Sequence, residues 1–416
     1  MRQVPNNRPL LTAALASIGS GLEYYAFICF ALQATVFSKL FFGGISSRFA
    51  LLETLATFAA GSVMTFFGGF FFGVIADRIG RKKVFLAAVG LMTVATVGIG
   101  LLPVGFGLYG SALLLLFRIL QGTAQGAELP GAITFICEHA QDRARGLSTG
   151  LLFLGVGLGA GLATLVNFLI NHYFTAAEIT AYAWRIPFLA ALVLGGVGYL
   201  LRRKTLETPI FLKQHQEVKT FFTAQLPGLK ILQGLGLVWL GAVMVSLGLF
   251  WPSFLTQYLH YQETQVFLAM TCAFVITALF LPVFGYLSDR LGRKNLYLIS
   301  LILLGLTLYP MLQHLQTGTS HYLFLFSFWY YLMIVMLASN YPVMLAELFP
   351  TRIRYQSVAL SYAGCYAIAG LIPVLAGAIL LKFSVLPVLI GLLYVSWLIS
   401  FLAWWVYREH QGSLDF

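Results

Sequence analysis

The chain has 416 residues, of which 59% are hydrophobic and only 9% are charged. Soluble domains contain roughly 45–50% apolar and about 25% charged residues, so this composition excludes a soluble protein and indicates one that crosses the membrane many times. The formal net charge is +11. Because the basic residues lie in short loops between apolar segments, this charge reflects membrane topology, and we expect no nucleic-acid partner.

Many segments are long and apolar enough to cross a bilayer as helices, since about 20 helical residues span a hydrocarbon core of roughly 30 Å. Twelve spans are expected, at residues 11–41, 51–76, 84–104, 109–137, 146–171, 184–202, 231–259, 264–288, 295–315, 320–346, 355–381 and 385–407. The sequence therefore predicts an all-α membrane protein embedded in the lipid bilayer.

The basic residues indicate on which side of the membrane the two termini lie, because cytoplasmic loops are enriched in Lys and Arg. Most of the 25 Lys and Arg residues fall in the termini or in the loops after spans 2, 4, 6, 8 and 10. The exceptions are Lys39, Arg48, Arg185, Lys382 and the intramembrane Arg118. An even number of spans leaves both termini on one side, so we expect both in the cytoplasm.

A charged turn between two apolar spans occurs twice. The segment from Gly73 to Lys83 reads GVIADRIGRKK, and the segment from Gly285 to Asn295 reads GYLSDRLGRKN. The repeated residues are Gly73, Asp77, Arg78 and Arg81 in the first copy and Gly285, Asp289, Arg290 and Arg293 in the second. A second motif, E-x4-R-x-R, recurs at nearly the same offset, as Glu138, Arg143 and Arg145 and as Glu347, Arg352 and Arg354.

Two motifs repeated at nearly one offset indicate a tandem duplication. We expect an N-terminal six-helix bundle at residues 1–202, a cytoplasmic linker at 203–230 and a C-terminal six-helix bundle at 231–416. Since both halves enter the membrane from the cytoplasm, the repeats are parallel, which is one of the arrangements found in transporters.

Ionisable residues inside a bilayer are costly and are therefore functional candidates by default. Three lie well inside the predicted spans, namely Glu23, Arg118 and Glu128. In span 4, Arg118, Gln121, Gln125 and Glu128 recur at i, i+3, i+7 and i+10, which places them within an arc of about 80° on a helix. Such a polar stripe must face a water-filled cavity or a protein interior.

The stripe allows two interpretations. Arg118 stays charged and suits a substrate carboxylate, with Gln121 and Gln125 as further ligands. Glu23 and Glu128 are able to exchange protons, because burial raises the pKa of a carboxyl group toward neutrality. In the alternative, Arg118 and Glu128 form an internal ion pair that only fixes helix packing.

The C-terminal spans are almost uncharged but carry polar and aromatic residues that are candidates for the opposite wall of a cavity. They are Trp251, Gln257, Tyr258, Tyr330, Tyr331, Asn340, Tyr341, Tyr362 and Tyr366. Of these, Trp251, Tyr330 and Asn340 are assigned as substrate-binding candidates.

The glycine run from Gly155 to Gly161 lies in an apolar span and follows no strand, so it indicates close helix packing and not a nucleotide site. The sequence contains no Walker-type Gly-x4-Gly-Lys-Ser/Thr motif, and its four cysteines are scattered singly without metal-ligand spacing. We therefore expect no cofactor and no metal, and any accumulation must draw on an ion or substrate gradient.

The duplicated turn resembles the signature of the major facilitator superfamily. Within it, the chain resembles the metabolite:proton symporter family, whose members carry small carboxylates, shikimate-like acids, citrate, proline and betaine. The matching segments are GLEYYAF at 21–27, RILQG at 118–122 continuing to Glu128, ETPIF at 207–211 and AELFPTRIRY at 346–355. The resemblance covers essentially the whole chain and adds Tyr24 to the substrate-binding candidates.

The resemblance implies a cytoplasmic gate formed by the residues of the two repeated motifs, with Asp77 or Asp289 meeting the N-terminus of a facing helix. The sequence also departs from the family, because Ala26 stands where the span 1 motif usually has Asp. Proton coupling then rests on Glu23 or is lost.

The sequence thus predicts a monomeric secondary transporter of the bacterial inner membrane, not an enzyme, which carries a small organic acid or zwitterion together with protons by alternating access. Two alternatives remain open. The first is an uncoupled facilitator, exchanger or exporter on the same fold, and the second is a membrane ligand sensor that transports nothing.

Overall fold

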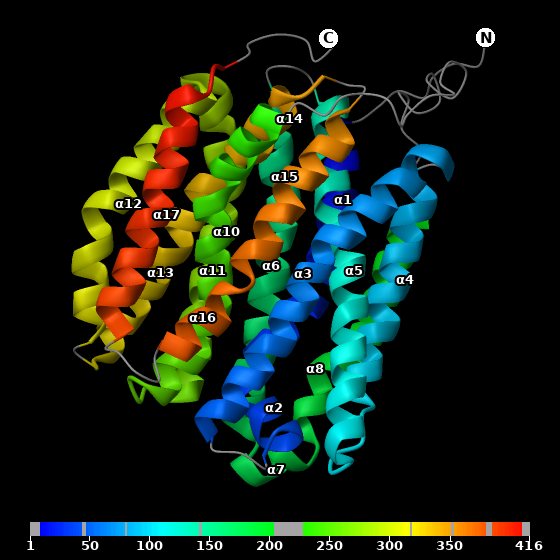
Figure 1. The fold of residues 1–416 in the computed structure, drawn as a ribbon, viewed down its shortest axis with the longest axis vertical. Coiled ribbons are helices and arrows are strands. Elements are labelled where there is room, and N and C mark those ends of the chain that lie inside the picture. Colours follow the sequence, from blue (N-terminus) through cyan, green and yellow to red (C-terminus); the bar gives the residue numbers. More distant parts are fainter. Residues whose placement is uncertain are drawn as a thin grey trace.

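The computed structural model describes residues 9–43, 47–79, 81–140, 144–203, 228–316, 318–350, 353–379 and 385–409. Every regular element in these ranges is a helix, so the all-α expectation is confirmed (Figure 1). The N-terminal helices are α1 (Pro9–Leu32), α2 (Ala34–Phe41), α3 (Ser47–Ile79), α4 (Arg81–Gly100), α5 (Gly107–His139), α6 (Arg145–Tyr173), α7 (Ala176–Ala181), the 3-10 turn η2 (Ala183–Arg185) and α8 (Ile186–Arg203). The C-terminal helices are α10 (Gly228–Gln257), α11 (Glu263–Leu291), α12 (Arg293–Leu315), α13 (Ser320–Ala338), α14 (Tyr341–Leu348), α15 (Arg354–Ala369), α16 (Ile372–Ile379) and α17 (Val385–Val406).

Within the described ranges, 11 helical segments are long and apolar enough to cross a membrane, and the bent pair of α1 and α2 brings the number to 12. These segments coincide with the twelve expected spans to within a few residues. Three expected spans are interrupted. The first bends by 56° between Leu32 and Ala34, and the other two are divided into α13 with α14 and α15 with α16. Pro342 and Pro373 each follow the first residue of the resumed helix, a position where the missing N–H is tolerated.

Helices α1 to α8 and helices α10 to α17 form two bundles that lie side by side, with the start of α1 and the end of α17 at the top of Figure 1 and with α2 and α7 at the opposite end. We refer to these two ends as the terminal end and the distal end. Residues 204–227, which make up most of the expected linker, lie outside the described ranges. The exact limits of the two halves stay a prediction.

Direct backbone contact between α6 and α11 joins the two bundles. A Cβ atom at Gly146 would lie 2.3 Å from the carbonyl oxygen of Gly285, and one at Gly150 would lie 2.5 Å from that of Leu281. The contact between Gly146 and Gly285 lies at the terminal end of the crossing. Farther along α6, Gly157 packs against the side chain of Ala278. Small residues allow such an approach in a membrane, where close packing replaces the hydrophobic effect as the cause of helix association.

The glycine run of α6 has a second face. Cβ atoms at Gly155 and Gly159 would each lie 2.0 Å from a backbone oxygen of α1, that of Ser17 and that of Gly21 respectively. The run therefore inserts α6 between α1 and α11, which confirms the packing role expected from the sequence. Substrate cavities can form only in the space that this tight crossing leaves open.

We expect Gly150→Val to destabilise the protein by about 1–3 kcal/mol or more, because the added side chain must push α6 away from the α11 backbone. Gly90→Val on α4 is the matched control, since a Cβ at Gly90 meets nothing within 4 Å. Thermal unfolding of the purified protein in detergent measures the difference. Equal melting temperatures for the two variants would contradict the interpretation of this crossing.

Candidate functional site

The polar stripe of α5 faces α1. The hydroxyl of Ser20 donates a hydrogen bond of 2.7 Å to Glu128, and the amide of Gln121 donates one of 3.4 Å to the carbonyl of Ala26. Residue numbers rise on one helix as they fall on the other, so the two helices are antiparallel. Glu23, which lies midway between the two α1 residues, is therefore level with the middle of the stripe. Both carboxylic acids are buried, with exposed fractions of 4% for Glu23 and 0% for Glu128.

Arg118 is fully buried beside this stripe. Its Nη1 donates to the carbonyl of Phe27 at 2.9 Å and to Oε1 of Gln121 at 3.0 Å, while Nε and Nη2 make no hydrogen bond. The guanidinium carbon lies 4.1 Å from the ring centroid of Phe27 and 4.5 Å from that of Phe58. Within the described part of the chain no ion pair joins Arg118 to Glu128. The structure therefore gives no support to the packing-pair alternative, and the Nε and Nη2 nitrogens of Arg118 keep their N–H groups available.

Two adjoining cavities lie between the bundles near mid-membrane. The larger, of about 80 Å³, has mostly apolar and aromatic walls, and the smaller, of about 40 Å³, is bordered by Gln125 and by the hydroxyls of Ser62, Thr65 and Ser246. Residues common to both walls are Tyr24, Leu129, Val245, Leu249, Tyr362 and Tyr366. Because both halves contribute to these walls, the cavities change shape whenever the two bundles move relative to each other.

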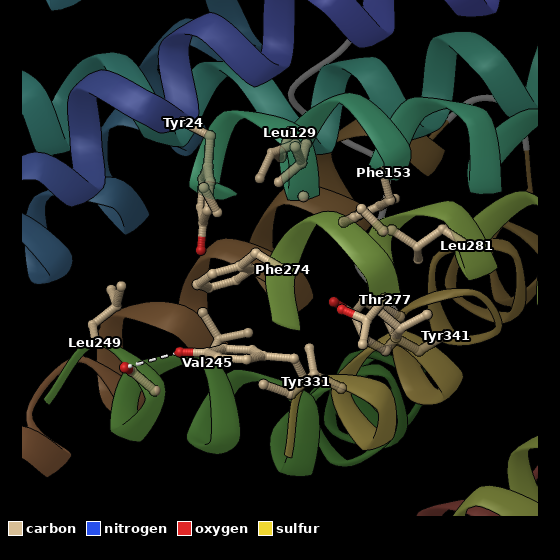
Figure 2. A pocket seen from close by; sticks show the side chains of 18 of the residues that line it. Tyr24, Leu129, Phe153, Val245, Leu249, Phe274, Thr277, Leu281, Tyr331 and Tyr341 are labelled. Atoms are coloured by element: carbon tan, nitrogen blue, oxygen red, sulfur yellow. Dashed lines mark hydrogen bonds between the residues drawn. The ribbon is translucent and has the colours of Figure 1, made fainter. Parts of the chain in front are cut away.

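Five tyrosines line the larger cavity, namely Tyr24, Tyr331, Tyr341, Tyr362 and Tyr366. The rings of Tyr362 and Tyr366 stack at 4.6 Å, and the hydroxyls of Tyr341 and Tyr366 lie 3.3 Å apart. Figure 2 shows Tyr24 reaching into the cavity from the N-terminal half, toward Phe274 and Tyr331. Convergent aromatic rings are a common feature of sites that recognise organic cations, because the ring faces carry negative charge density.

The structure separates the sequence candidates into two groups. Tyr24 and Gln125 line the cavities, whereas Arg118, Gln121, Trp251, Tyr330 and Asn340 do not. Trp251 packs edge-on against Tyr330 at 5.4 Å, the hydroxyl of Tyr330 donates to the carbonyl of Met244, and the Asn340 amide donates to that of Met336.

Tyr331 follows Tyr330 in the chain and Tyr341 follows Asn340, and both of these tyrosines line the larger cavity. One position along a helix turns a side chain by 100°. The pair Tyr362 and Tyr366, spaced i and i+4 and expected from the sequence to lie on the opposite wall, does line it.

At the terminal end the duplicated E-x4-R-x-R motifs pair with each other across the two halves. Arg145 of the first copy lies 3.5 Å from Glu347 of the second, and Arg354 of the second lies 3.3 Å from Glu138 of the first. Arg293 of the charged turn adds a 3.1 Å contact to Glu347. All five side chains are buried, so these ion pairs exclude water from the terminal end.

Asp289 of the charged turn caps α6 of the other half. Its carboxylate accepts hydrogen bonds from the backbone N–H groups of Gly146 and Leu147, both at 2.9 Å, and lies 3.3 Å from Arg293. The N-terminus of a helix carries a partial positive charge, which this carboxylate complements. The contact connects the two bundles at the point where Gly146 and Gly285 already touch.

Other residues of the two motifs lie at the edge of this network. The guanidinium of Arg290 covers the ring of Tyr286 at 5.0 Å, and a Cβ at Gly73 would lie 2.9 Å from the ring of Tyr355. The remaining expected gate residues cannot be placed, because the side chains of Asp77, Arg78 and Arg81 and the whole of Arg143 and Arg352 lie outside the described parts of the chain.

The distal end contrasts with the closed terminal end, because a cavity of about 580 Å³ opens there between the bundles. It is bordered by α2 and the start of α3 on one side and by the end of α10 and the start of α11 on the other. This structure is therefore closed at the terminal end and open at the distal end.

Comparisons with known proteins agree with this architecture. Residues 11–224 match the family described as sugar (and other) transporter, and residues 233–415 match the Major Facilitator Superfamily. The chain belongs to the major facilitator superfamily. It is a multi-pass membrane transporter and not an enzyme.

Two bacterial relatives align over most of their length. The chain is 32% identical to the glycine betaine/proline/ectoine/pipecolic acid transporter OusA of Dickeya dadantii and 31% identical to the proline/betaine transporter of Escherichia coli K12. Each alignment covers 89% of this chain and 77% of the relative. Among solved structures, the proton:xylose symporter XylE bound to 6-bromo-6-deoxy-D-glucose superposes with a TM-score of 0.79 at 17% identity, covering 95% of this chain and 94% of XylE. That likeness establishes the fold alone.

We expect Asp289→Asn to loosen the terminal end, because an uncharged amide complements the α6 N-terminus less well than a carboxylate. A loss of about 1–2 kcal/mol would shift the equilibrium between closed and open terminal ends by about 5–30-fold. Cys137 is a native reporter, since it is buried and lies in the electrostatic field of Glu347 and Arg145.

The rate at which a maleimide labels Cys137 measures this shift, in a background where the other cysteines are replaced by alanine. Arg290→Gln, which changes a charge in the same turn without touching α6, is the control. Labelling of the Asp289→Asn variant at the control rate would show that the turn does not hold the terminal end closed.

Proposed function

We propose that the chain is a proton-coupled symporter of small zwitterionic solutes of the betaine and proline type. It acts in a bacterial inner membrane with both termini in the cytoplasm, so that the terminal end is the cytoplasmic one. The observation that carries the proposal is the cavity of five tyrosines between the two halves. The substrates named for the two bacterial relatives belong to the same chemical class.

A betaine or proline has a positively charged nitrogen and a carboxylate, and the two cavities match these two ends. The tyrosine rings of the larger cavity attract a quaternary or secondary ammonium by cation–π interaction without requiring a carboxylate partner. The smaller cavity offers the Gln125 amide and the Ser246 hydroxyl to the carboxylate end, since the hydroxyls of Ser62 and Thr65 already donate to backbone carbonyls of α3.

Arg118 makes this smaller cavity electropositive. Its guanidinium packs against the rings of Phe27 and Phe58, which both line the smaller cavity. A buried charge in an environment of low dielectric constant is screened little, so the charge of Arg118 acts on the cavity across these two rings. The zwitterion is therefore expected to bind with its carboxylate toward Gln125 and its ammonium among the tyrosines.

Glu23 is the proposed proton carrier. It precedes Tyr24, which lines both cavities, so a change in the charge of Glu23 acts directly on a residue that touches the substrate. A symporter needs a group that gains a proton on one side of the membrane and releases it on the other. Glu128, which accepts the hydrogen bond of Ser20, is the second acid of this region.

Transport follows by alternating access around the bound solute. In the structure the terminal end is held by ion pairs and by the Asp289 cap, while the distal end is open to the solute. Opening the terminal end requires these contacts to break. The glycines at the crossing of α6 and α11 have no side chains to interlock. The simplest movement is therefore a rigid rotation of one bundle against the other about this crossing.

An uncoupled exchanger is the second candidate function. Ala26, which replaces the usual aspartate, is 4% exposed and contributes to the stripe only through its backbone oxygen. If Glu23 does not carry the proton, no carboxyl group of α1 is left to do so.

We expect Tyr366→Leu to weaken glycine betaine binding about tenfold, since a desolvated cation–π interaction contributes up to about 2 kcal/mol. Tyr366→Phe should retain most of the affinity, because the ring is kept. Tyr199→Leu, at a tyrosine of α8 that is 42% exposed, is the control. Isothermal titration of the purified protein with glycine betaine measures all three. Unchanged affinity in Tyr366→Leu would exclude the tyrosine cavity as the site.

We expect Glu23→Gln to abolish accumulation of proline driven by a pH difference while leaving proline exchange across the membrane measurable, because exchange requires no net deprotonation. Uptake into proteoliposomes, with and without an imposed pH gradient, measures both activities. Glu53→Gln, at an exposed position of α3, controls for the loss of a carboxyl group. Accumulation by the Glu23→Gln variant would show that another group couples the proton, and a wild type that ignores the gradient would support the exchanger.

A further inference from the structure

The distal cavity contains a pair of opposite charges that face each other across its opening. Its wall on the N-terminal half includes Lys39, and its wall on the C-terminal half includes Glu263. Lys39 acts electrostatically on Glu263, yet no ion pair within 4.0 Å joins them among the described residues. Most of the remaining lining is polar or aromatic, including Thr256, Gln257, Tyr258 and His260.

Each of the two charges is supported by the helix that carries it. Lys39 lies in the last turn of α2, where the partial negative charge of the helix end favours a cation. Glu263 is the first residue of α11, where the partial positive charge favours an anion. Each helix end therefore favours the charged form of the group that it carries, and that group would attract a partner of opposite sign.

The wall that carries Glu263 is held in place by the preceding turn. His260 adopts a left-handed backbone conformation with φ of 57°, and the hydroxyl of the buried Tyr261 donates a 2.9 Å hydrogen bond to the carbonyl of Leu315. This bond anchors the turn to the end of α12. The position of Glu263 relative to the cavity is thus determined by packing and not by the charge of Lys39.

We propose that this distal cavity is a second binding site for zwitterions, in which Lys39 binds the carboxylate and Glu263 binds the ammonium group. A volume of about 580 Å³ is ample for a small solute and lies in the range of ligand pockets. A zwitterion matches two separated opposite charges, whereas a simple anion or cation would be attracted by one wall and repelled by the other.

The distal site is distinct from the mid-membrane cavities. Leu249 borders the mid-membrane cavities and Gln257 borders the distal one, which separates them by about 12 Å along α10. Two solutes of betaine size can therefore be bound at the same time. The inference rests on the proposed function for the solute class. It adds a loading step, in which the vestibule concentrates zwitterions before they enter the tyrosine cavity.

A cysteine at Gln257 reports on this site directly, because Gln257 lines the cavity and is exposed. All four native cysteines are replaced by alanine, because Cys272 is partly exposed and the buried Cys137 would become accessible when the terminal end opens. The experiment measures the rate of maleimide labelling of Gln257→Cys in reconstituted protein with increasing glycine betaine. We expect glycine betaine to slow labelling. The concentration for half-protection should rise about three- to fivefold in Glu263→Gln and in Lys39→Gln, as expected for one exposed charge interaction.

Two further variants sharpen the test. Exchanging the charges, Lys39→Glu with Glu263→Lys, should restore protection, because the zwitterion binds in the reverse orientation. Glu53→Gln is the control for removing an exposed carboxyl group, and in this variant glycine betaine should slow labelling as much as in the parent protein. Protection that persists unchanged when both Lys39 and Glu263 are neutralised would overturn the proposal, since it would arise from closure of the carrier and not from binding here.

Uptake by the same proteoliposomes separates this inference from the proposed function. Uptake of glycine betaine without any protection of Gln257→Cys would overturn the distal site and leave the transport function intact. Protection without uptake would support the distal site and overturn the proposed function. Absence of both would overturn both.

Discussion

The direct backbone contact between α6 and α11 is the constraint on which the rest of the structure depends. In a bilayer, helices are not driven together by the hydrophobic effect, so the two halves adhere where small residues permit close approach. Gly146, Gly150 and Gly157 provide this approach along α6. The same crossing brings Asp289 to the first turn of α6 and places Phe153 and Leu281 in the wall of the tyrosine cavity. Gate and cavity are therefore parts of one interface.

The two halves contribute different chemistry to that interface. The N-terminal half supplies the buried ionisable groups Glu23, Arg118 and Glu128, and the C-terminal half supplies most of the aromatic rings. This division would suit a solute with separated charges, with the cation among the rings and the anion nearer to the fixed positive charge. It also places both buried carboxylic acids, Glu23 and Glu128, in the same half as Arg118.

Duplication explains how the terminal end closes. Each copy of the E-x4-R-x-R motif contributes one glutamate and one arginine to ion pairs with the other copy. Arg145 pairs with Glu347, and Arg354 pairs with Glu138. Buried ion pairs contribute little net stability, because desolvation offsets most of their attraction. Their value here is specificity, since breaking one leaves an uncompensated charge and so disfavours partly open arrangements.

The sequence alone determined the number and order of the spans, the duplication and the polar stripe of α5. Each of these depends on local composition or on spacing along a single helix. The tertiary structure decided which residues meet. Tyr331 and Tyr341 line the cavity while their neighbours Tyr330 and Asn340 do not, because the rotation of a helix about its axis is set by what it packs against. Arg118 likewise contacts Phe27 and Phe58, which are far from it in the chain, and Lys39 and Glu263 border one cavity although they lie in different halves. Such contacts exist only once the two halves have packed.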